Sequence, residues 1–236
     1  MKAKANSRYV GNIRDITTKI PVGDLRTELL KWWCNEKRPF PWRETRDPYR
    51  VLIAEILLHR TKAEQVVSLY GRFLRLFPDI PALARATPEK LTQLFYSGGL
   101  HWRWKLIHSM AVTLEDSFKG EIPDNYYDLI SLPGVSHYIA SAVRCFAFGH
   151  PDVILDTNTV RVVGRLYDLP ITDSSRRSRL FRAVLEELID TERPREFNFA
   201  LIDFAALICK SKTPKHEVCH LNRHCYYYKK INFTDN

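Results

Sequence analysis

Apolar residues recur at three- and four-residue spacing along most of the chain from Leu25 onward. This period predicts amphipathic helices, and we expect them over 26–33, 49–77, 88–96, 102–118, 137–148, 157–169, 178–189 and 196–209. Pro, Gly and Asp fall between these segments, where helix boundaries need them. No stretch alternates apolar and polar residues convincingly, as a half-buried strand would. The sequence therefore predicts an all-α fold.

The helices are expected to form two lobes. Residues 45–154 make one central run of helices, and the segments 23–44 and 155–208 are expected to pair as the second lobe. A groove between two helical lobes is a natural place for a ligand. Residues 1–22 are polar and basic without a clear period and are expected to be a loose arm, and 226–236 a tail.

Composition narrows the class of protein. The 236 residues are 45% hydrophobic, which suits a folded core rather than a disordered chain. The net charge is +9, and a basic balance is the usual footprint of a protein that binds a phosphate backbone, although many basic proteins bind nothing acidic. No apolar run reaches membrane-spanning length and no signal peptide is visible, so we expect a cytoplasmic protein without a membrane partner.

The segment Leu132-Pro133-Gly134-Val135 joins a helix over 124–132 to the helix over 137–148. A tight Pro-Gly turn exposes backbone N–H groups at a helix N-terminus, where anions bind. A DNA phosphate fits such a site, and the contact is indifferent to base sequence. The tetrapeptide alone is better explained as an ordinary helical hairpin.

Asp156 stands where the helix over 157–169 begins. Asp is a common N-cap, and the same geometry also serves chemistry, because the helix dipole and N–H groups favour an ionised carboxylate. A fixed anion there can offset the positive charge that develops on a deoxyribose as its base departs.

Three of the five cysteines, Cys209, Cys219 and Cys225, lie close together near the C-terminus. An odd number of cysteines without a secretion signal argues against a disulfide scaffold. These three are better explained as ligands of a metal or cluster.

Taken together, these features resemble the helix-hairpin-helix DNA glycosylase superfamily, which includes the endonuclease III group. LPGVSHYIASAV is similar to its hairpin, Asp156 falls at its catalytic aspartate, and the similarity runs from PFPWRETRDPY (39–49) to Cys225. The resemblance implies a base-excision enzyme on double-stranded DNA. It also implies that Leu132, Gly134 and Val135 hold a phosphate through a monovalent cation.

Tyr138 bears on the type of reaction. Bifunctional members of the endonuclease III group carry a lysine here, which attacks the sugar and permits strand cleavage. A phenol cannot form that Schiff base, so the resemblance implies a monofunctional glycosylase that leaves an abasic site. Tyr138 is expected either to support the reacting sugar or to pack as an ordinary aromatic.

Glu55 is the only charge in VLIAEILL. If buried, its carboxyl would have a raised pKa and could act as an acid; alternatively, Glu55, His59 and Lys62 form a solvated stripe on one helix face. The resemblance favours the first interpretation, because MutY-type adenine glycosylases and thermophilic G·T mismatch glycosylases both carry Glu here.

Leu58-His59-Arg60-Thr61 is closer to the Leu-Arg-Arg-Thr of the G·T mismatch thymine glycosylases than to the Leu-Gln-Gln-Thr of adenine glycosylases. Arg60, beside His59, is expected to fill the gap left by the flipped base and to bond the opposite guanine. Leu100 or His101 is expected to wedge into the stack from the other side. His59 and Arg60 also fit simple surface charges.

Asn158 is expected at the DNA interface, and it fits both the adenine and the thymine glycosylases. Two features favour the thymine glycosylases. One is the segment FNFALIDFAALIC, and the other is the end of the chain at Asn236, which leaves no room for an 8-oxoguanine-recognising domain. We therefore expect a monomeric glycosylase that removes thymine or uracil opposite guanine. The alternatives are an adenine glycosylase acting on A·G or A·8-oxoguanine, and a non-catalytic DNA-binding module.

The family's iron–sulfur loop follows Cys-x6-Cys-x2-Cys-x5-Cys. Residues 209–225 keep this spacing with His216 in place of the second cysteine. Three thiolates and an imidazole suit a [4Fe–4S] cluster, which we expect, but they also suit tetrahedral zinc, and a degenerate loop without metal is a third alternative.

Overall fold

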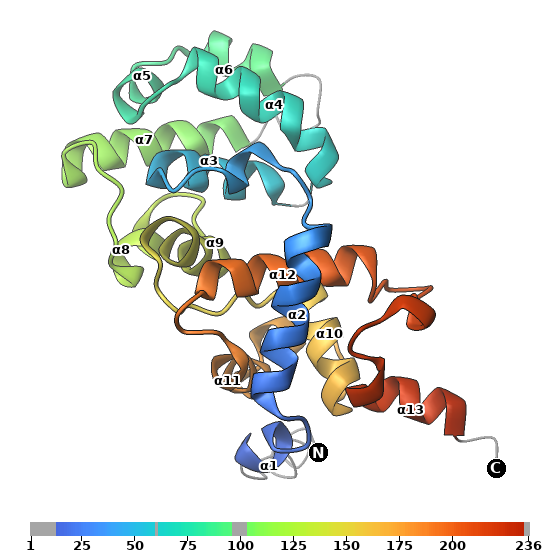
Figure 1. Cartoon of the computed structure of the whole chain (residues 1–236). Coiled ribbons are helices and arrows are strands. Elements are labelled where there is room, and N and C mark those ends of the chain that lie inside the picture. Colours follow the sequence, from blue (N-terminus) through green and yellow to red (C-terminus); the bar gives the residue numbers. More distant parts are fainter. Residues whose placement is uncertain (1–12, 60, 96–102, 234–236) are drawn as a thin grey trace. The chain divides into compact units, whose positions relative to one another are not determined.

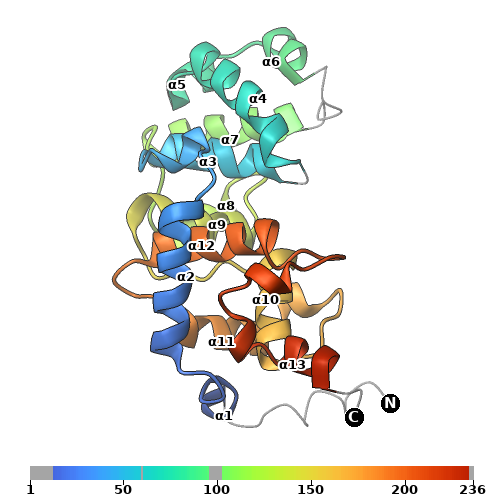
Figure 2. The same cartoon turned by 45° about the vertical axis from the view of Figure 1, so that its right-hand side comes forward.

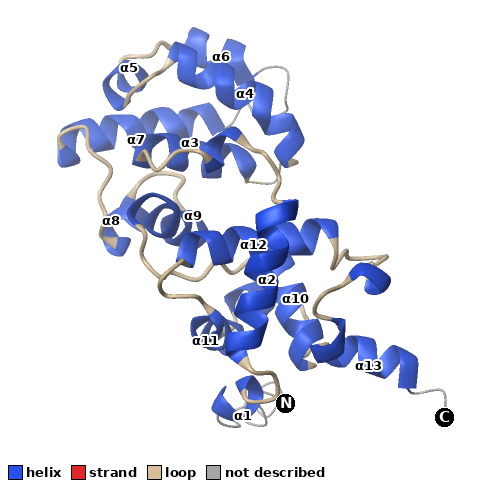
Figure 3. Ribbon diagram, viewed as in Figure 1, coloured by secondary structure: helices blue, strands red, loops and turns tan. Residues whose placement is uncertain are grey.

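The computed structural model describes residues 13–59, 61–95 and 103–233. All regular elements within these ranges are helical (Figure 3), which confirms the all-α prediction. Among the described helices, none combines the length and the apolar character that crossing a membrane requires.

The chain forms two compact units. One consists of Met1–Arg38 with Pro151–Asn236, and the other of Pro39–His150.

The first unit joins the N-terminal helices to the C-terminal third of the chain. Its elements are α1 (Ile13–Thr17), α2 (Val22–Glu36), α10 (Thr157–Tyr167), α11 (Arg179–Leu188), α12 (Pro194–Leu207) and α13 (Tyr226–Phe233), with short 3-10 turns at Ser175–Arg177, His216–Val218 and Asn222–His224. The long helix α2 crosses α12, and α10 packs against α11, α12 and α13 (Figures 1 and 2).

The core of this unit follows from the helical period. On α11, Phe181, Val184, Leu185 and Leu188 are buried, at positions i, i+3, i+4 and i+7, so one apolar stripe faces the neighbouring helices. The remaining positions of α11 are largely charged and lie at the surface.

The second unit is built around α3 (Pro48–Leu58). Its other elements are a 3-10 turn at Pro41–Arg43, α4 (Ala63–Leu76), α5 (Ile80–Ala84), α6 (Pro88–Phe95), α7 (Arg103–Phe118), α8 (Tyr126–Ser131), α9 (His137–Val143) and a π-helical turn at Arg144–Phe148. Every residue of α3 from Val51 to Leu57 is buried, and a helix that is apolar all round occupies the centre of its unit. It packs against α4 and α9.

The structure interrupts the single helix predicted over 49–77. α3 ends at Leu58 and α4 begins at Ala63. His59 has φ −59° and ψ 112°, which is not helical, and the Thr61 N–H donates to the Leu58 carbonyl at 3.0 Å. The polar stretch between the two helices offers no apolar residue to continue the buried stripe.

Two segments expected to lack regular structure are partly helical. Within the expected loose arm, Ile13–Thr17 forms α1, and Ile16 and Ile20 are buried in the core of the first unit. Within the expected tail, Tyr226–Phe233 forms α13, which packs against α10. Helices of two turns or fewer are too short for a hydrophobic period to be recognised.

Candidate active site

Asp156 is the N-cap of α10, as its position in the sequence predicts. One carboxylate oxygen, Oδ1, accepts hydrogen bonds from the backbone N–H groups of Asn158 and Thr159, both at 2.8 Å. The Thr159 hydroxyl in return accepts from the Asp156 N–H at 3.0 Å, which completes a capping box. The carboxylate, which is half-buried, is therefore held in one orientation.

Asn158 connects this carboxylate to a half-buried arginine, Arg161. Its side-chain Nδ2 donates to Asp156 Oδ2 at 2.8 Å, and its Oδ1 accepts from Arg161 Nη2 at 3.1 Å. Arg161 also donates to the carbonyls of Ala205 (2.9 Å) and Cys209 (2.8 Å). A continuous chain of hydrogen bonds thus runs from Asp156 to the first residue of the 209–225 loop.

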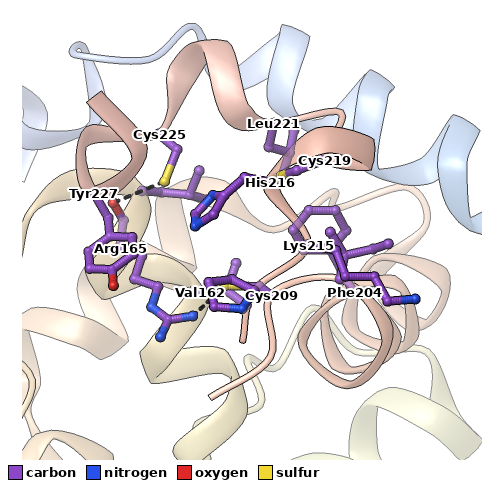
Figure 4. A pocket seen from close by; sticks show the side chains of 13 residues that line it. Val162, Arg165, Phe204, Cys209, Lys215, His216, Cys219, Leu221, Cys225 and Tyr227 are labelled. Carbon is purple, nitrogen blue, oxygen red and sulfur yellow. Dashed lines mark hydrogen bonds between the residues drawn. The ribbon is translucent and has the colours of Figure 1, made fainter. Parts of the chain in front are cut away.

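The four predicted metal ligands line one pocket of the first unit (Figure 4). Cys209, His216, Cys219 and Cys225 all border it, together with residues of α10 and α12. Among the described residues, no group of three or more His, Cys, Asp or Glu side chains is close enough to bind a single metal ion. The donors are thus spread around a space of about 350 Å³ that includes open solvent.

Burial shifts the pKa values of donors in this pocket. Burial, together with the charges of Cys225 and Cys209, raises the pKa of the Cys219 thiol to about 11. Burial, and then the charge of Arg165, lowers the pKa of His216, which favours the neutral imidazole that a metal ligand must be. Three thiols in an apolar pocket ionise readily only when a metal compensates their charge.

Aromatic and basic side chains fix the geometry around the pocket. The His216 ring stacks on Tyr228 and Tyr227, with ring centroids 5.0 and 6.0 Å away. Arg165 lies 4.8 Å from the centroid of Tyr227, and its Nη1 donates to Cys209 Sγ at 3.5 Å. The residues present therefore fit a metal cluster in donor type and in lining one pocket.

The predicted hairpin lies in the second unit, between α8 and α9. Gly134 has φ +80°, in the left-handed region that glycine adopts without strain, and the Val135 N–H donates to the Leu132 carbonyl at 3.1 Å. Leu132 and Val135 are buried and anchor the turn, whereas Gly134 is exposed. Its amide region is thus available to a ligand.

Tyr138 and Glu55 also belong to the second unit. Tyr138 is half-buried on the first turn of α9, directly after the hairpin. Glu55 is only 4% exposed, in the middle of α3, so the alternative of a solvated stripe is wrong for this residue. His59 and Lys62, which the same stripe would include, are exposed.

His59 borders a second pocket, which also involves the hairpin. Its lining includes Pro133 and Gly134 of the hairpin and Arg103 of α7. The other three residues predicted to replace the flipped base, Arg60, Leu100 and His101, lie outside the described residues.

The predicted site residues thus form two groups. Asp156 and Asn158 share the first unit with the four residues of the 209–225 loop, to which Arg161 connects them. Glu55, His59, Tyr138 and the hairpin share the second unit.

The family of the chain follows from comparison with known proteins. Residues 53–187, which include the hairpin and Asp156, match the family described as HhH-GPD superfamily base excision DNA repair protein. The chain belongs to this superfamily.

Individual members of the HhH-GPD superfamily are similar over most of the chain. A thymine/uracil-DNA glycosylase of Methanothermobacter thermautotrophicus is 33% identical over 86% of this chain and 92% of its own length. An adenine DNA glycosylase of Buchnera aphidicola subsp. Baizongia pistaciae is 31% identical over 85% of this chain and 57% of its own length. The solved structure of a thermostable thymine-DNA glycosylase superposes with a TM-score of 0.83 and 32% identity, covering 89% of this chain and 97% of that one.

Sequence reasoning missed two residues of this HhH-GPD chain that organise its candidate sites. Arg161 links Asn158 to the loop, and Arg103, buried at the start of α7, contacts the end of α3. Both look like ordinary surface arginines of amphipathic helices. Their acceptors are backbone carbonyls more than 40 residues away, which no local pattern reveals.

Proposed function

We propose that this protein is a monofunctional DNA glycosylase that removes thymine or uracil opposite guanine and leaves an abasic site. The observation that carries the proposal is the Asp156 carboxylate, fixed by three donors at 2.8 Å, in a chain whose sequence matches a base-excision family. The names of the thymine/uracil-DNA glycosylase relatives support the choice of base. The enzyme acts as a monomer on double-stranded DNA in the cytoplasm.

Asp156 is the catalytic residue in this proposal. As the bond between base and sugar breaks, positive charge develops on the deoxyribose, and a preorganised carboxylate stabilises it without first having to reorient. Asp156 also positions the water that completes hydrolysis. Asn158 and Thr159 keep the carboxylate in place during the step.

The hairpin around Gly134 holds a DNA phosphate, with a monovalent cation between the turn and the phosphate. Such contacts fix the position of the duplex without selecting a sequence. Selection comes from unpairing, because a mismatched base leaves the stack at a lower cost than a well-paired one. Arg60, beside His59, fills the gap and bonds the opposite guanine, and Leu100 or His101 wedges into the stack from the other side.

The absence of an amine at position 138 supports hydrolysis without strand cleavage. A tyrosine cannot form the Schiff base that a lysine forms with the sugar. Tyr138 instead supports the reacting sugar, and the buried Glu55 acts as a proton donor toward the departing base.

The 209–225 loop holds a [4Fe–4S] cluster through Cys209, His216, Cys219 and Cys225. The family's ligand spacing, together with the position of all four donors around one pocket, supports the cluster over tetrahedral zinc. These four residues would hold the cluster, which when bound would tie the loop together. The chain's own residues carry out base excision.

A panel of duplexes tests the function. Radiolabelled G·T, G·U, A·G, A·8-oxoguanine and oxidised-pyrimidine substrates are incubated with the protein and resolved with and without alkali. We expect cleavage at G·T and G·U only after alkali. Cleavage at A·G or A·8-oxoguanine alone would establish the second candidate, an adenine glycosylase, which the adenine glycosylase relative supports.

Asp156→Asn tests the catalytic assignment. The variant keeps the shape of the cap, and we expect the single-turnover rate to fall about a hundredfold to a thousandfold, as when a preorganised charge-stabilising group is removed. Affinity for an uncleavable mismatched duplex should persist. Asp168→Asn is the matched control, because Asp168 ends the same helix in a left-handed conformation that Asn tolerates. Full activity of Asp156→Asn would refute the scheme.

A further inference from the structure

Arg103 is a buried arginine at the first position of α7. It is only 3% exposed, and its guanidinium reaches across to the end of α3. Nη1 donates to the carbonyls of Ile56 (3.4 Å) and Leu57 (3.2 Å) and to the Thr61 hydroxyl (3.4 Å), and Nη2 donates to the His59 carbonyl.

The carbonyls among these acceptors are the groups that a helix leaves unpaired at its C-terminus. The last four carbonyls of a helix have no partner within it, and α3 ends at Leu58. Arg103 therefore caps α3 from another helix, and its positive charge suits the negative end of the helix dipole. A guanidinium, with five donors in a rigid fork, can bond several acceptors at once, which a lysine ammonium does less well.

The same turn of α7 also contacts the hairpin. A Cβ placed on Gly134 would lie 3.2 Å from Cβ of Leu106, so the two backbones approach closely there. Arg103, Leu106, His59 and Gly134 all line the second pocket. One rigid helical turn thus contacts both the end of α3 and the phosphate-binding hairpin of the proposed function.

We propose that Arg103 is a positioning residue for base flipping in duplex DNA. It holds the His59 backbone and the Thr61 side chain at a fixed distance from the hairpin. The segment that replaces the flipped base and the turn that holds the phosphate therefore meet the duplex together. This inference rests on the proposed function and adds a residue that never touches DNA.

Base flipping is measured separately from excision. A duplex carries uncleavable 2′-fluorothymidine opposite guanine, with 2-aminopurine as the neighbouring base, whose fluorescence rises when the stack opens. Excision is followed in single turnover on a matched G·U duplex. The variants are Arg103→Met, Arg103→Lys and Thr61→Val, and the control is Lys105→Met, which removes an exposed charge from the same helix.

We expect Arg103→Met to lose most of the fluorescence rise and to excise uracil about tenfold more slowly, since small misplacements of positioning groups have effects of this order. The fluorescence rise and the excision rate of Arg103→Lys should fall between those of Arg103→Met and the wild type. Thr61→Val should lose less of both. Lys105→Met should match the wild type. Affinity for the duplex, which depends on phosphate contacts, should change little.

Two results would overturn the inference. One is an Arg103→Met protein that opens the stack and excises like the wild type. The other is slow excision with an unaltered fluorescence rise, which would assign Arg103 to the chemical step. If thermal melting shows that Arg103→Met does not fold, Arg103→Lys and Thr61→Val decide by the same two readouts. A wild-type protein that excises no base from any duplex would instead refute the proposed function.

Discussion

Replacing Arg161 by Met tests whether the 209–225 loop supports the carboxylate of Asp156, the proposed catalytic group. The change keeps an unbranched side chain but removes three hydrogen bonds, to the Cys209 and Ala205 carbonyls and to Asn158 Oδ1. Each bond from a charged donor contributes about 1.5–3 kcal/mol. Burial, which lowers the pKa of Arg161, offsets part of this contribution. We expect the free energy of unfolding to fall by about 2–4 kcal/mol.

The effect on catalysis should be smaller than that of removing Asp156. The carboxylate keeps its two backbone donors, but the Asn158 side chain loses the anchor that orients it. We expect single-turnover excision of uracil from a G·U duplex to slow about tenfold, equivalent to about 1.4 kcal/mol of transition-state stabilisation. Urea titration measures stability, and an unchanged slope with a lower midpoint would show that the denatured state is not altered.

Arg165→Met is the matched control for this experiment. Arg165 lies one turn further along α10 and donates to the carbonyls of Lys210 and Ser211 and to Cys209 Sγ rather than to Asn158. Both variants should weaken the attachment of the loop, and only Arg161→Met should slow the chemical step. Equal loss of rate in the two variants would refute the link through Asn158, because general loosening of the loop would then explain both.

Two further predictions concern the reaction type and the cofactor. Tyr138→Lys should gain some cleavage at abasic sites without alkali, because the new amine can form a Schiff base. Borohydride should trap this adduct with Tyr138→Lys and none with Tyr138→Phe. Failure to trap an adduct with Tyr138→Lys would count against the proposed placement of this residue. Protein purified without oxygen should be coloured and contain iron and acid-labile sulfide. His216→Cys should retain the iron and sulfide, and His216→Ala should lose much of both. Zinc without sulfide would overturn the assignment of a cluster.

Much of the fold could be predicted because long amphipathic helices carry their own signal. The stripe on α11 and the apolar α3 are visible in the sequence as residues spaced by one helical turn. The Pro-Gly turn of the hairpin and the N-cap at Asp156 were predictable for a similar reason, since backbone conformation there depends on one or two local residues.

The parts that sequence reasoning missed depend on contacts between distant segments. The break between α3 and α4 coincides with carbonyls that Arg103 caps from a position more than 40 residues away. The short helices α1 and α13 gain their stability by packing on α11 and α10, since helices of this length are marginal alone. A hydrophobic period predicts a helix, whereas the positions of helix ends and the contacts of Arg103 and Arg161 depend on tertiary partners.

This distinction explains why the candidate site residues were easier to predict from the sequence than the residues that support them. A catalytic carboxylate must stand at a definite place on a helix end, and a hairpin must have a definite turn, so both leave local marks in the sequence. The residues that hold them need only donate hydrogen bonds from a suitable direction. Arg161 and Arg103 both do so by bonding main-chain carbonyls, which any sequence supplies. Substitutions at these two arginines should therefore separate positioning from chemistry, because neither removes a group that the reaction itself requires.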